Sequence, residues 1–548
     1  MKQLFLLVFV AWLAAPAVSH AQSPEALKAL ADLALDDADK REAAVTTLGT
    51  TRDPKWLELL GALRDGNVYA RGQGKRLEVV VGGAKSTKGD QDVIEIATAY
   101  DRKALGTVAV ASLTEIAADR RLRIAIKPFL DADETRAQLA SRDAETRRGA
   151  AVKLGHQADA GAASVVEGAI AKETNGAVRH AFREALALIR LAHGDAAVRT
   201  LAAQSLGALH SSDAMPALQK LAADASASPA ERDAASQAIR QIERWNLGVR
   251  TVETVFQGAS LASILLLMSV GLAIVFGLMG VINMAHGELM ALGAYTTFVV
   301  QNVFRARWPE WFDAYFVVAL PASFLVAAAV GIVLERGVIR RLYGRPLETL
   351  LLTWGASLII QQGLRLWFGA ANVDVSSPRW LSGGFALMTG LTLPFNRLFI
   401  IGLAAVCVAA MYGLLFRTNR GLTIRAVTQN RAMSACLGVR AGVVDAVTFG
   451  LGAGLAGLAG CALTQVGNVG PSLGQNYIVD SFMVVVTGGV GKLAGTILAA
   501  AGIGGLNKGI EPALGAVFAK VAILLAVIIF LQRRPAGLFA TRGRNAEA

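Results

Sequence analysis

Cysteine is scarce in this sequence and absent from its first 406 residues. The three cysteines of the 548-residue chain are Cys407, Cys436 and Cys461. Because none lies earlier, the first part of the chain has no disulfide framework, and its hydrophobic core alone must stabilise it.

Common catalytic signatures are also missing. The sequence does not contain the HExxH pattern of zinc peptidases. The segment TGGVGKL at 487–493 lacks the first glycine and the Ser or Thr of a nucleotide-binding P-loop. These absences argue against an enzyme, and we expect no metal or other cofactor in this chain.

Membrane-length apolar runs are absent between 22 and 245 but recur from about 255 onward. This contrast predicts an exported soluble domain at 22–245, a linker at 246–255, a membrane domain at 256–532 and a cytoplasmic tail at 533–548. The net charge of +12 lies largely in short loops between apolar runs. Membrane orientation accounts for such charge, so nucleic acid is not an expected partner.

The N-terminus resembles a secretory signal peptide. Residues 1–21 have an early lysine and an apolar centre, and they end in Ser19-His20-Ala21. We expect cleavage after Ala21. The alternative is an uncleaved first membrane helix, which would also leave the following domain outside the cytoplasm.

The exported part repeats one pattern, Arg-x-x-Ala-x-x-x-Leu-Gly, which begins at Arg41, Arg147 and Arg199; a weaker copy begins at Arg232. Ala and Leu four apart share a helical face, and the following Gly is typical of a helix stop. The recurrence resembles a HEAT-type α-solenoid. Alternating segments at 76–81, 92–100 and 121–126 predict a small β insert at about 66–127.

The function of this exported domain stays open on the sequence alone. Helical repeats present extended surfaces for protein contact, so one interpretation is docking of a partner. The other is a passive extension. His156, His180, His193 and His210 are scattered without the spacing of metal ligands.

The second part of the chain predicts an all-α polytopic membrane protein of about eight complete or broken spans. The spans are expected at 256–279, 284–302, 315–335, 350–369, 397–416, 443–466 and 514–531. Arginine-rich loops after the third and fifth spans place both loops in the cytoplasm. The tail is basic too, so the region 478–508, interrupted by Gly-Gly-Val-Gly at 488–491, should enter and leave from one side.

Two groups of polar residues lie within this apolar sequence. The first is Asn283, His286 and Glu288; the second is Gln465, Asn468, Gln475 and Asp480. Ionisable groups at membrane depth usually face a cavity or a partner. Neutral amides with one carboxylate suit a small, uncharged, hydrogen-bonding solute. The alternative is that these residues are solvated or cap helices.

The sixth span is rich in glycine, at Gly450, Gly454, Gly457 and Gly460. Small residues four apart favour close helix packing. A permeation path beside this helix is the alternative.

The loop after the fifth span, NRGLTIRAVTQNRAMSACLGV, predicts an amphipathic cytoplasmic helix capped by Asn419. Its polar candidates are Arg420, Arg425, Gln429, Asn430 and Arg431. Such a helix could lie on anionic lipid. It could equally be the lever by which a nucleotide-hydrolysing partner moves the membrane domain.

Several ordered blocks carry a family resemblance. GLAIVFGLMGVINMAHGELMALGAY, RGLTIRAVTQNRAMSACLGV, FGLGAGLAGLAG, and GGVGKLAGTILAA followed by RPAGLF resemble the branched-chain amino-acid ABC permease family. INMAHGE, the block QVGNVGPSLGQNYIVDSFMVVVTGGVG and the exported extension are most similar to its urea-transporting branch. The GVGK segment departs slightly from the GVGN that this resemblance leads us to expect.

The resemblance implies a bacterial inner-membrane importer with a periplasmic N-terminal domain. It implies a homologous second permease subunit, separate ABC ATPase subunits that use ATP, and a periplasmic solute-binding protein. Residues 420–440 would contact an ATPase. We therefore expect a permease for urea. Branched-chain amino acids or other small amides are alternative substrates, and a receptor-like membrane protein is the competing class.

Overall fold

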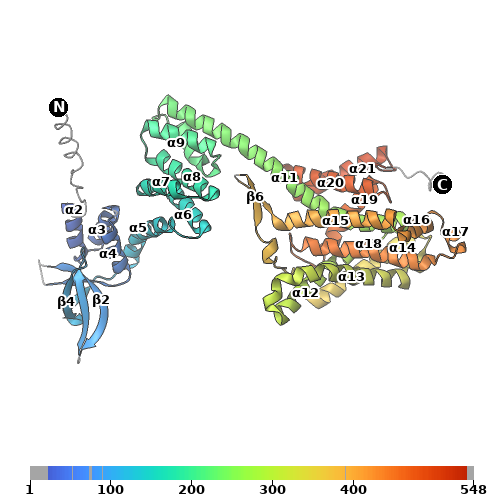
Figure 1. Cartoon of the computed structure of the whole chain (residues 1–548), viewed down its shortest axis with the longest axis horizontal. Coiled ribbons are helices and arrows are strands. Elements are labelled where there is room, and N and C mark those ends of the chain that lie inside the picture. Colours follow the sequence, from blue (N-terminus) through green and yellow to red (C-terminus); the bar gives the residue numbers. More distant parts are fainter. Residues whose placement is uncertain (1–22, 52, 73–76, 89–90, 389, 540–548) are drawn as a thin grey trace, which may run out of the picture. The chain divides into compact units, whose positions relative to one another are not determined.

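The computed structural model describes residues 23–51, 53–72, 77–88, 91–388 and 390–539. The chain divides into two compact units, and the boundary in the sequence lies between Trp245 and Asn246 (Figure 1). The predicted signal peptide, 1–21, lies outside the described residues, as does the end of the predicted tail.

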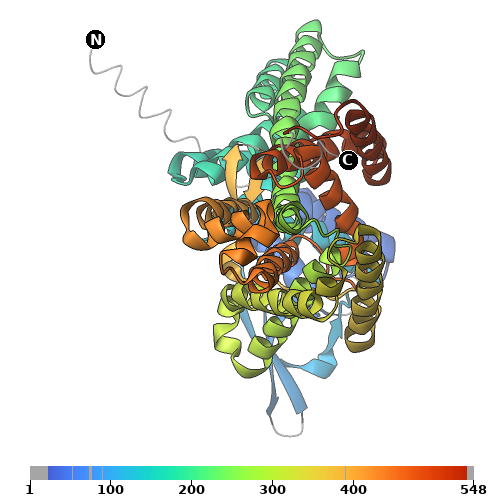
Figure 2. The same ribbon diagram turned by 90° about the vertical axis from the view of Figure 1, so that its right-hand side faces the viewer.

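From Ser23, where the described residues start, the first unit has three helices and a five-stranded antiparallel sheet of order β4-β3-β2-β1-β5. The hairpin of β2 and β3 extends beyond the neighbouring helices (Figures 1 and 2). The helices are α2 (Pro24–Leu33), α3 (Ala38–Thr51) and α4 (Pro54–Arg64), and the strands are β1 (Val68–Arg71), β2 (Glu78–Lys88), β3 (Gln91–Thr98), β4 (Ala104–Ala109) and β5 (Leu113–Glu115).

One predicted strand, 121–126, is wrong: it lies in helix α5 (Arg120–Gln138), and the sheet ends at Glu115. The Asp119 side chain accepts a hydrogen bond from the backbone N–H of Leu122 at 2.8 Å and so caps the helix. Leu122 and Ile126 are buried, whereas Ile124 is 63% exposed. The alternating pattern led to a wrong strand prediction because Leu122 and Ile126 are four residues apart, a spacing that also fits one face of a helix.

The rest of this unit is helical, and the repeated motif occupies equivalent positions on α3, α6 and α9. The further elements are α6 (Ala144–Gln157), α7 (Ala163–Lys172), α8 (Gly176–His193), α9 (Ala196–Ala208) and α10 (Met215–Ala223). The motif glycines are not helix stops, which corrects the prediction. A Cβ on Gly155 would lie 3.0 Å from Ala185 Cα, and one on Gly207 would lie 2.9 Å from Ala238 Cα. These glycines allow close helix packing instead.

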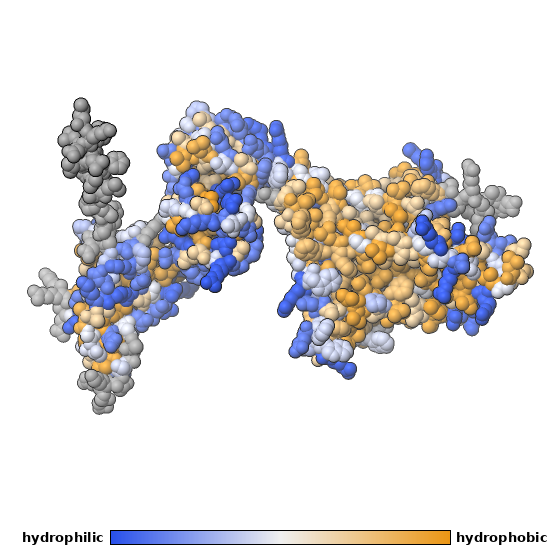
Figure 3. All heavy atoms as spheres, viewed as in Figure 1, coloured by the Kyte–Doolittle hydropathy of each residue, from blue (hydrophilic) through white to orange (hydrophobic). Residues whose placement is uncertain are grey.

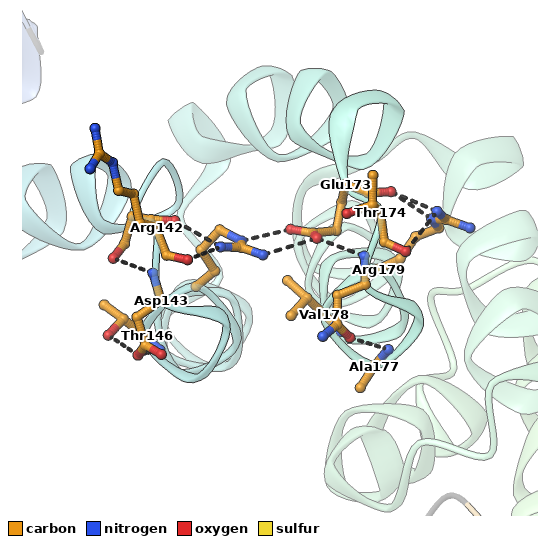
Figure 4. A network of polar contacts seen from close by, with 11 residues as sticks. Arg142, Asp143, Thr146, Glu173, Thr174, Ala177, Val178 and Arg179 are labelled. Atoms are coloured by element: carbon orange, nitrogen blue, oxygen red, sulfur yellow. Dashed lines mark hydrogen bonds and ion pairs between the residues drawn. The ribbon is translucent and has the colours of Figure 1, made fainter.

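Two of the motif arginines, Arg147 and Arg199, pair with buried glutamates. Arg147 Nε lies 2.7 Å from Glu173 Oε2, and Arg199 Nε lies 2.7 Å from Glu231 Oε1. Glu173 also accepts from the backbone N–H of Asn175, within the polar network of Figure 4. The hydrogen bond from Arg147, followed by that from Asn175, lowers the pKa of Glu173. Arg147 and Arg199 occupy the same position in the motif, and each pairs with a glutamate at or just before the start of a later helix.

Helix α11 (Pro229–Met279) is continuous over 51 residues and includes 246–255, the segment predicted as a linker. The weaker copy of the motif, which begins at Arg232, lies in its first turns. The second unit therefore starts inside a helix rather than after a loop.

Long helices build the second unit, and the face of this unit that Figure 3 shows is largely apolar. After α11 come α12 (His286–Arg307), α13 (Tyr315–Gly337), α14 (Pro346–Phe368), α15 (Phe395–Arg417), α16 (Asn419–Gln429), α17 (Arg431–Cys436), α18 (Ala441–Leu463), α19 (Leu473–Gly488), α20 (Leu493–Leu514) and α21 (Ala516–Arg533). A hairpin of β6 (Gly384–Met388) and β7 (Leu391–Pro394) separates α14 from α15. The sequence patterns did not predict this hairpin.

Six helices in the described part of the chain are long and apolar enough to cross a membrane: α11, α13 with the turn before it, α15, α18, α20 and α21. Helices α12 and α14 occupy the predicted spans 284–302 and 350–369 but carry more polar residues. The chain breaks after Gly488, as predicted. Helix α19 has 16 residues, so it is only about 24 Å long.

Candidate functional site

The break between α11 and α12 buries all three polar residues of the first predicted group. Asn283 and His286 have no exposed surface, and Glu288 is 1% exposed. His286 Nε2 lies 3.1 Å from the carbonyl oxygen of Met268 on α11. These residues therefore lie inside the unit rather than in a solvated turn.

Helix α14 faces this break with a row of polar side chains, which we call the α14 stripe. Its members are four residues apart and buried: Thr349, Thr353, Ser357 and Gln361. Residues at this spacing share one helical face. The opposite face is apolar and exposed, for example at Ile359.

The α14 stripe contacts both predicted polar groups. Thr353 Oγ1 accepts from the backbone N–H of Met284 at 3.1 Å, and Ser357 Oγ donates to Glu288 Oε1 at 3.3 Å. Further along, Gln475 Nε2 on α19 donates to Gln361 Oε1 at 3.4 Å. The structure therefore brings Glu288 and Gln475 to one helix, although they are far apart in sequence.

Two side chains beside the stripe retain unused hydrogen-bonding capacity. Among the described residues, neither amide atom of Asn283 nor Oε2 of Glu288 has a hydrogen-bond partner. Buried polar atoms nearly always find partners in protein or water. A water or a small polar solute can supply them here.

The α14 stripe is not among the predicted site residues, because the sequence pattern predicts 350–369 as an ordinary span. The available signal was Thr-x-x-x-Thr-x-x-x-Ser-x-x-x-Gln from Thr349 to Gln361. A row of this kind on one face of a membrane-length helix indicates that the face is buried in protein.

Gln465 and Asn468, which also belong to the second predicted group, lie away from the α14 stripe. Gln465 Nε2 lies 3.4 Å from Tyr315 Oη, and the Gln465 carbonyl accepts from Asn396 Nδ2 at 2.7 Å. Asn468 is exposed, next to the bridge between Val373 and Val469. In these positions Gln465 and Asn468 lie at the loops that connect helices, and neither contacts the stripe.

Asp480 forms an ion pair that the sequence analysis did not anticipate. Its Oδ2 lies 3.3 Å from Lys520 Nζ on α21, and the Asp480 side chain is 10% exposed. Lys520 was read as part of an apolar span. Pairing lowers the cost of an ionised group at membrane depth, so Asp480 here joins α19 to α21.

The glycines of α18 lie against three other helices. A Cβ on Gly454 would be 2.5 Å from the Phe324 ring of α13, and one on Gly460 would overlap the Met290 carbonyl of α12. Gly450 faces Ile332 of α13, and Gly457 faces Ser323. Gly452 adds a close approach to Gly271 of α11. The space beside these glycines is filled by neighbouring backbone and side chains.

The basic loop forms two helices, α16 and α17, rather than one. Thr418 caps α16 by accepting from the backbone N–H of Gly421, so the predicted cap at Asn419 is wrong. Asn419 is the first helical residue. Asn430 interrupts the helix and caps α17 through the backbone N–H of Met433.

The five predicted coupling residues, Arg420, Arg425, Gln429, Asn430 and Arg431, are all exposed. Three apolar side chains of the same segment are exposed with them: Leu422, Met433 and Leu437. A mixed surface of this kind is typical of a protein contact.

Arg431 also belongs to a charged network that joins this segment to two long helices. Its Nη2 lies 2.6 Å from Asp445 Oδ2 on α18, and its guanidinium lies 4.6 Å from the ring centre of Tyr343. The Tyr343 hydroxyl donates at 2.9 Å to Glu335 of α13, and Arg340 Nε lies 3.4 Å from the same carboxylate oxygen. Displacement of α17 would therefore disturb α13 and α18.

Comparison with known proteins agrees with the arrangement of the second unit. The family described as "Branched-chain amino acid transport system / permease component" matches residues 254–532. BraD of Pseudomonas aeruginosa, a high-affinity branched-chain amino acid transport system permease protein, is 28% identical over 301 residues, covering 52% of this chain and 95% of BraD.

Two further relatives come from Escherichia coli K12. LivH, with the same printed description, is 26% identical over 300 residues, which cover 52% of this chain and 94% of LivH. The ribose import permease protein RbsC is 27% identical over 297 residues, which cover 51% of this chain and 86% of RbsC. The family match extends over half of the sequence. This chain therefore belongs to the branched-chain amino acid permease family, and it is the permease component of an ABC transporter rather than an enzyme.

Proposed function

We propose that this chain is a permease subunit of an ATP-driven importer for urea. The observation that carries the proposal is the α14 stripe. Ser357 bonds Glu288, and Thr353 bonds the backbone on both sides of Asn283. Asn283 and Glu288 both keep side-chain atoms without a described hydrogen-bond partner. Urea is small and uncharged, with one carbonyl acceptor and several N–H donors. Buried neutral donors and acceptors match such a solute, because each unpaired group would be costly without a partner.

Branched-chain amino acids are the alternative substrate, and the names of BraD and LivH favour them. A zwitterion, however, calls for a cation to pair its carboxylate in a desolvated site. Among the described side chains that hydrogen-bond to the stripe, Glu288 is the only charged one, and it is an acid; Arg365, whose charge also acts on Glu288, is exposed. This difference favours the uncharged solute.

The coupling role of α16 and α17 is part of the same proposal. An exposed mixed surface would contact an ABC ATPase, and the Arg431 network would carry the displacement to α13 and α18. A homologous second permease would complete the path, and a periplasmic solute-binding protein would deliver urea. ATP biases one state of the membrane pair through differential contacts. The setting is the bacterial inner membrane.

The N-terminal unit would lie in the periplasm as a HEAT-like solenoid with a β insert. Supporting observations are the equivalent packing of Gly155 and Gly207 and the equivalent pairing of Arg147 and Arg199. Its proposed task is to dock a periplasmic partner.

Uptake of radiolabelled urea and leucine tests the substrate. Cells that carry the partner subunits would be compared with and without this chain. We expect urea uptake to depend on the chain and leucine uptake to be unaffected. If leucine uptake depended on the chain and urea uptake did not, the importer role would stand and urea would be rejected as the substrate. Loss of neither, together with failure to co-purify with ATPase subunits, would favour a receptor-like protein.

A further inference from the structure

A cleft of about 890 Å³ lies away from the α14 stripe, among the ends of four elements of the second unit. Helix α11 contributes Leu278 near its last residue, and α20 contributes its first turn. The rest of the lining comes from α15, from Arg425 of α16 and from Phe539. Apart from Arg425, which belongs to the predicted coupling residues, no lining residue takes part in the proposed transport.

The walls of the cleft are apolar over a length that fits one membrane leaflet. On α15 the lining runs from Ala405 to Phe416, a rise of about 16 Å along the helix. Half of the hydrocarbon thickness is about 15 Å. Tyr412 and Phe416 are half exposed where α15 ends, and aromatic side chains are enriched at that depth of a membrane. The cleft therefore has the dimensions and surface of an acyl-chain site.

Two cations lie at the rim of the cleft: Arg425 and Lys492. Both are exposed, and in the described part of the chain neither has a carboxylate partner. The guanidinium of Arg425 lies 5.3 Å from the ring centre of Phe416. This contact holds the group over the apolar wall and leaves its N–H donors available. Among the described lining residues there is no Asp or Glu.

We infer that this cleft binds an anionic phospholipid, with an acyl chain along α15 and the phosphate at Arg425 and Lys492. Basic pockets between membrane helices bind anionic headgroups by such charge complementarity. The bound lipid would bridge α16 to the turn at 489–492 that precedes α20. Arg425 would then contact lipid, whereas Arg431, with its protein partners, would carry coupling.

Native mass spectrometry of the purified full-length chain, titrated with phosphatidylglycerol or phosphatidylcholine, tests this inference. We expect tighter binding of phosphatidylglycerol. The double variant Arg425→Gln and Lys492→Gln should weaken it about 30-fold, because each cation near the membrane surface contributes about fivefold. The matched control is Arg417→Gln with Arg440→Gln, which removes two exposed arginines outside the lining.

A third variant, Ala409→Phe, fills the apolar wall while it leaves both cations in place. It should also weaken phosphatidylglycerol binding, which separates a lipid from a free phosphate. Inorganic phosphate should compete only weakly. Equal affinity for the two lipids, unchanged binding in the double variant, or binding unaffected by Ala409→Phe would each overturn the inference.

Discussion

Helices α14 and α18 are both membrane-length, yet they bury opposite kinds of surface. Helix α18 is apolar and buried on nearly every side, with glycines in contact with α11, α12 and α13. Helix α14 buries only one face, and that face carries Thr349, Thr353, Ser357 and Gln361. In a bilayer, lipid already solvates the apolar surface of a helix, so the hydrophobic effect does not drive helices together.

This difference suggests different roles: the close packing of α18 fixes helix positions, and the buried polar face of α14 is the candidate solute site. Close contacts at α18 leave no room for a solute, so its glycines set helix positions. The polar face of α14 has a cost that packing alone does not explain, since neutral small residues would pack as well. The proposed binding of a polar solute would account for it.

The largest effect should come from adding volume to α18. Gly460→Val would force a side chain into the Met290 carbonyl, and backbone cannot yield cheaply. We expect little or no folded protein, measured as the monodisperse fraction after detergent extraction. Gly402→Val on α15 is the matched control, because a Cβ there meets nothing within 4 Å. Normal yield of the Gly460 variant would show that α18 is not tightly packed.

The next effect should come from the charged network at α17. Arg431→Glu leaves Asp445 without its cation and adds a like charge. Since Asp445 is buried but Arg431 is half exposed, the cost is about 2 kcal/mol, between surface and buried pairs. If this free-energy cost falls entirely on the coupling between the ATPase and the membrane helices, the rate of uptake falls about 30-fold.

Two comparisons sharpen this prediction. Arg440→Glu, an exposed arginine of the same loop, should retain most uptake. Adding Asp445→Arg to Arg431→Glu should restore part of it. Equal loss in both single variants would show that only the net charge of the loop matters.

Smaller effects should follow from single changes in the α14 stripe. On the proposed function, Ser357→Ala or Gln361→Ala would remove one hydrogen bond to the solute, worth about 0.5–1.5 kcal/mol. We expect kcat/KM for urea uptake to fall about 3- to 10-fold with unchanged protein yield. Thr448→Ala on α18 is the control, since its hydroxyl bonds only the carbonyl of Val444. An equal effect of all three would remove the distinction between the helices.

The smallest effect concerns the first unit and pH. The Arg147 guanidinium lowers the pKa of Glu173, so the stabilisation is complete above the ordinary value of about 4.3. It is lost as the pH falls through the lowered pKa. Amide exchange in α6 and α8, corrected for intrinsic rates, should therefore accelerate from pH 6 to pH 3.5.

Glu173→Gln should abolish this pH dependence. Glu167→Gln, which alters an exposed pair with Arg190, should preserve it. Persistent pH dependence in the Glu173 variant would assign the effect to another group.

The apolar runs located most membrane helices well. The predicted span 315–335 corresponds to Tyr315–Gly337, and 397–416 corresponds to Phe395–Arg417. Such runs are dictated locally by hydropathy and length. The strand prediction for 121–126 was wrong because the pattern of these six residues fits both a strand and a helix. The Asp119 cap stabilises the helix.

The site was less predictable because its contacts join distant segments. Asn283, His286 and Glu288 attracted attention as polar residues in an apolar context. Their neighbour, the α14 stripe, begins 61 residues after Glu288, at Thr349, and is recognised only when helix faces are compared. The partners of Arg431 are likewise set by packing, since Tyr343 comes from another loop.

The most direct measurement of the central claim is alkylation of Ser357→Cys in the assembled transporter, with Cys407, Cys436 and Cys461 replaced by serine or alanine. If the α14 stripe lines the solute path, urea should slow the reaction with a small thiol reagent, and leucine should not. Thr448→Cys should react at a rate that urea does not change. A Ser357→Cys rate unaffected by urea, in a variant that still transports it, would contradict the account.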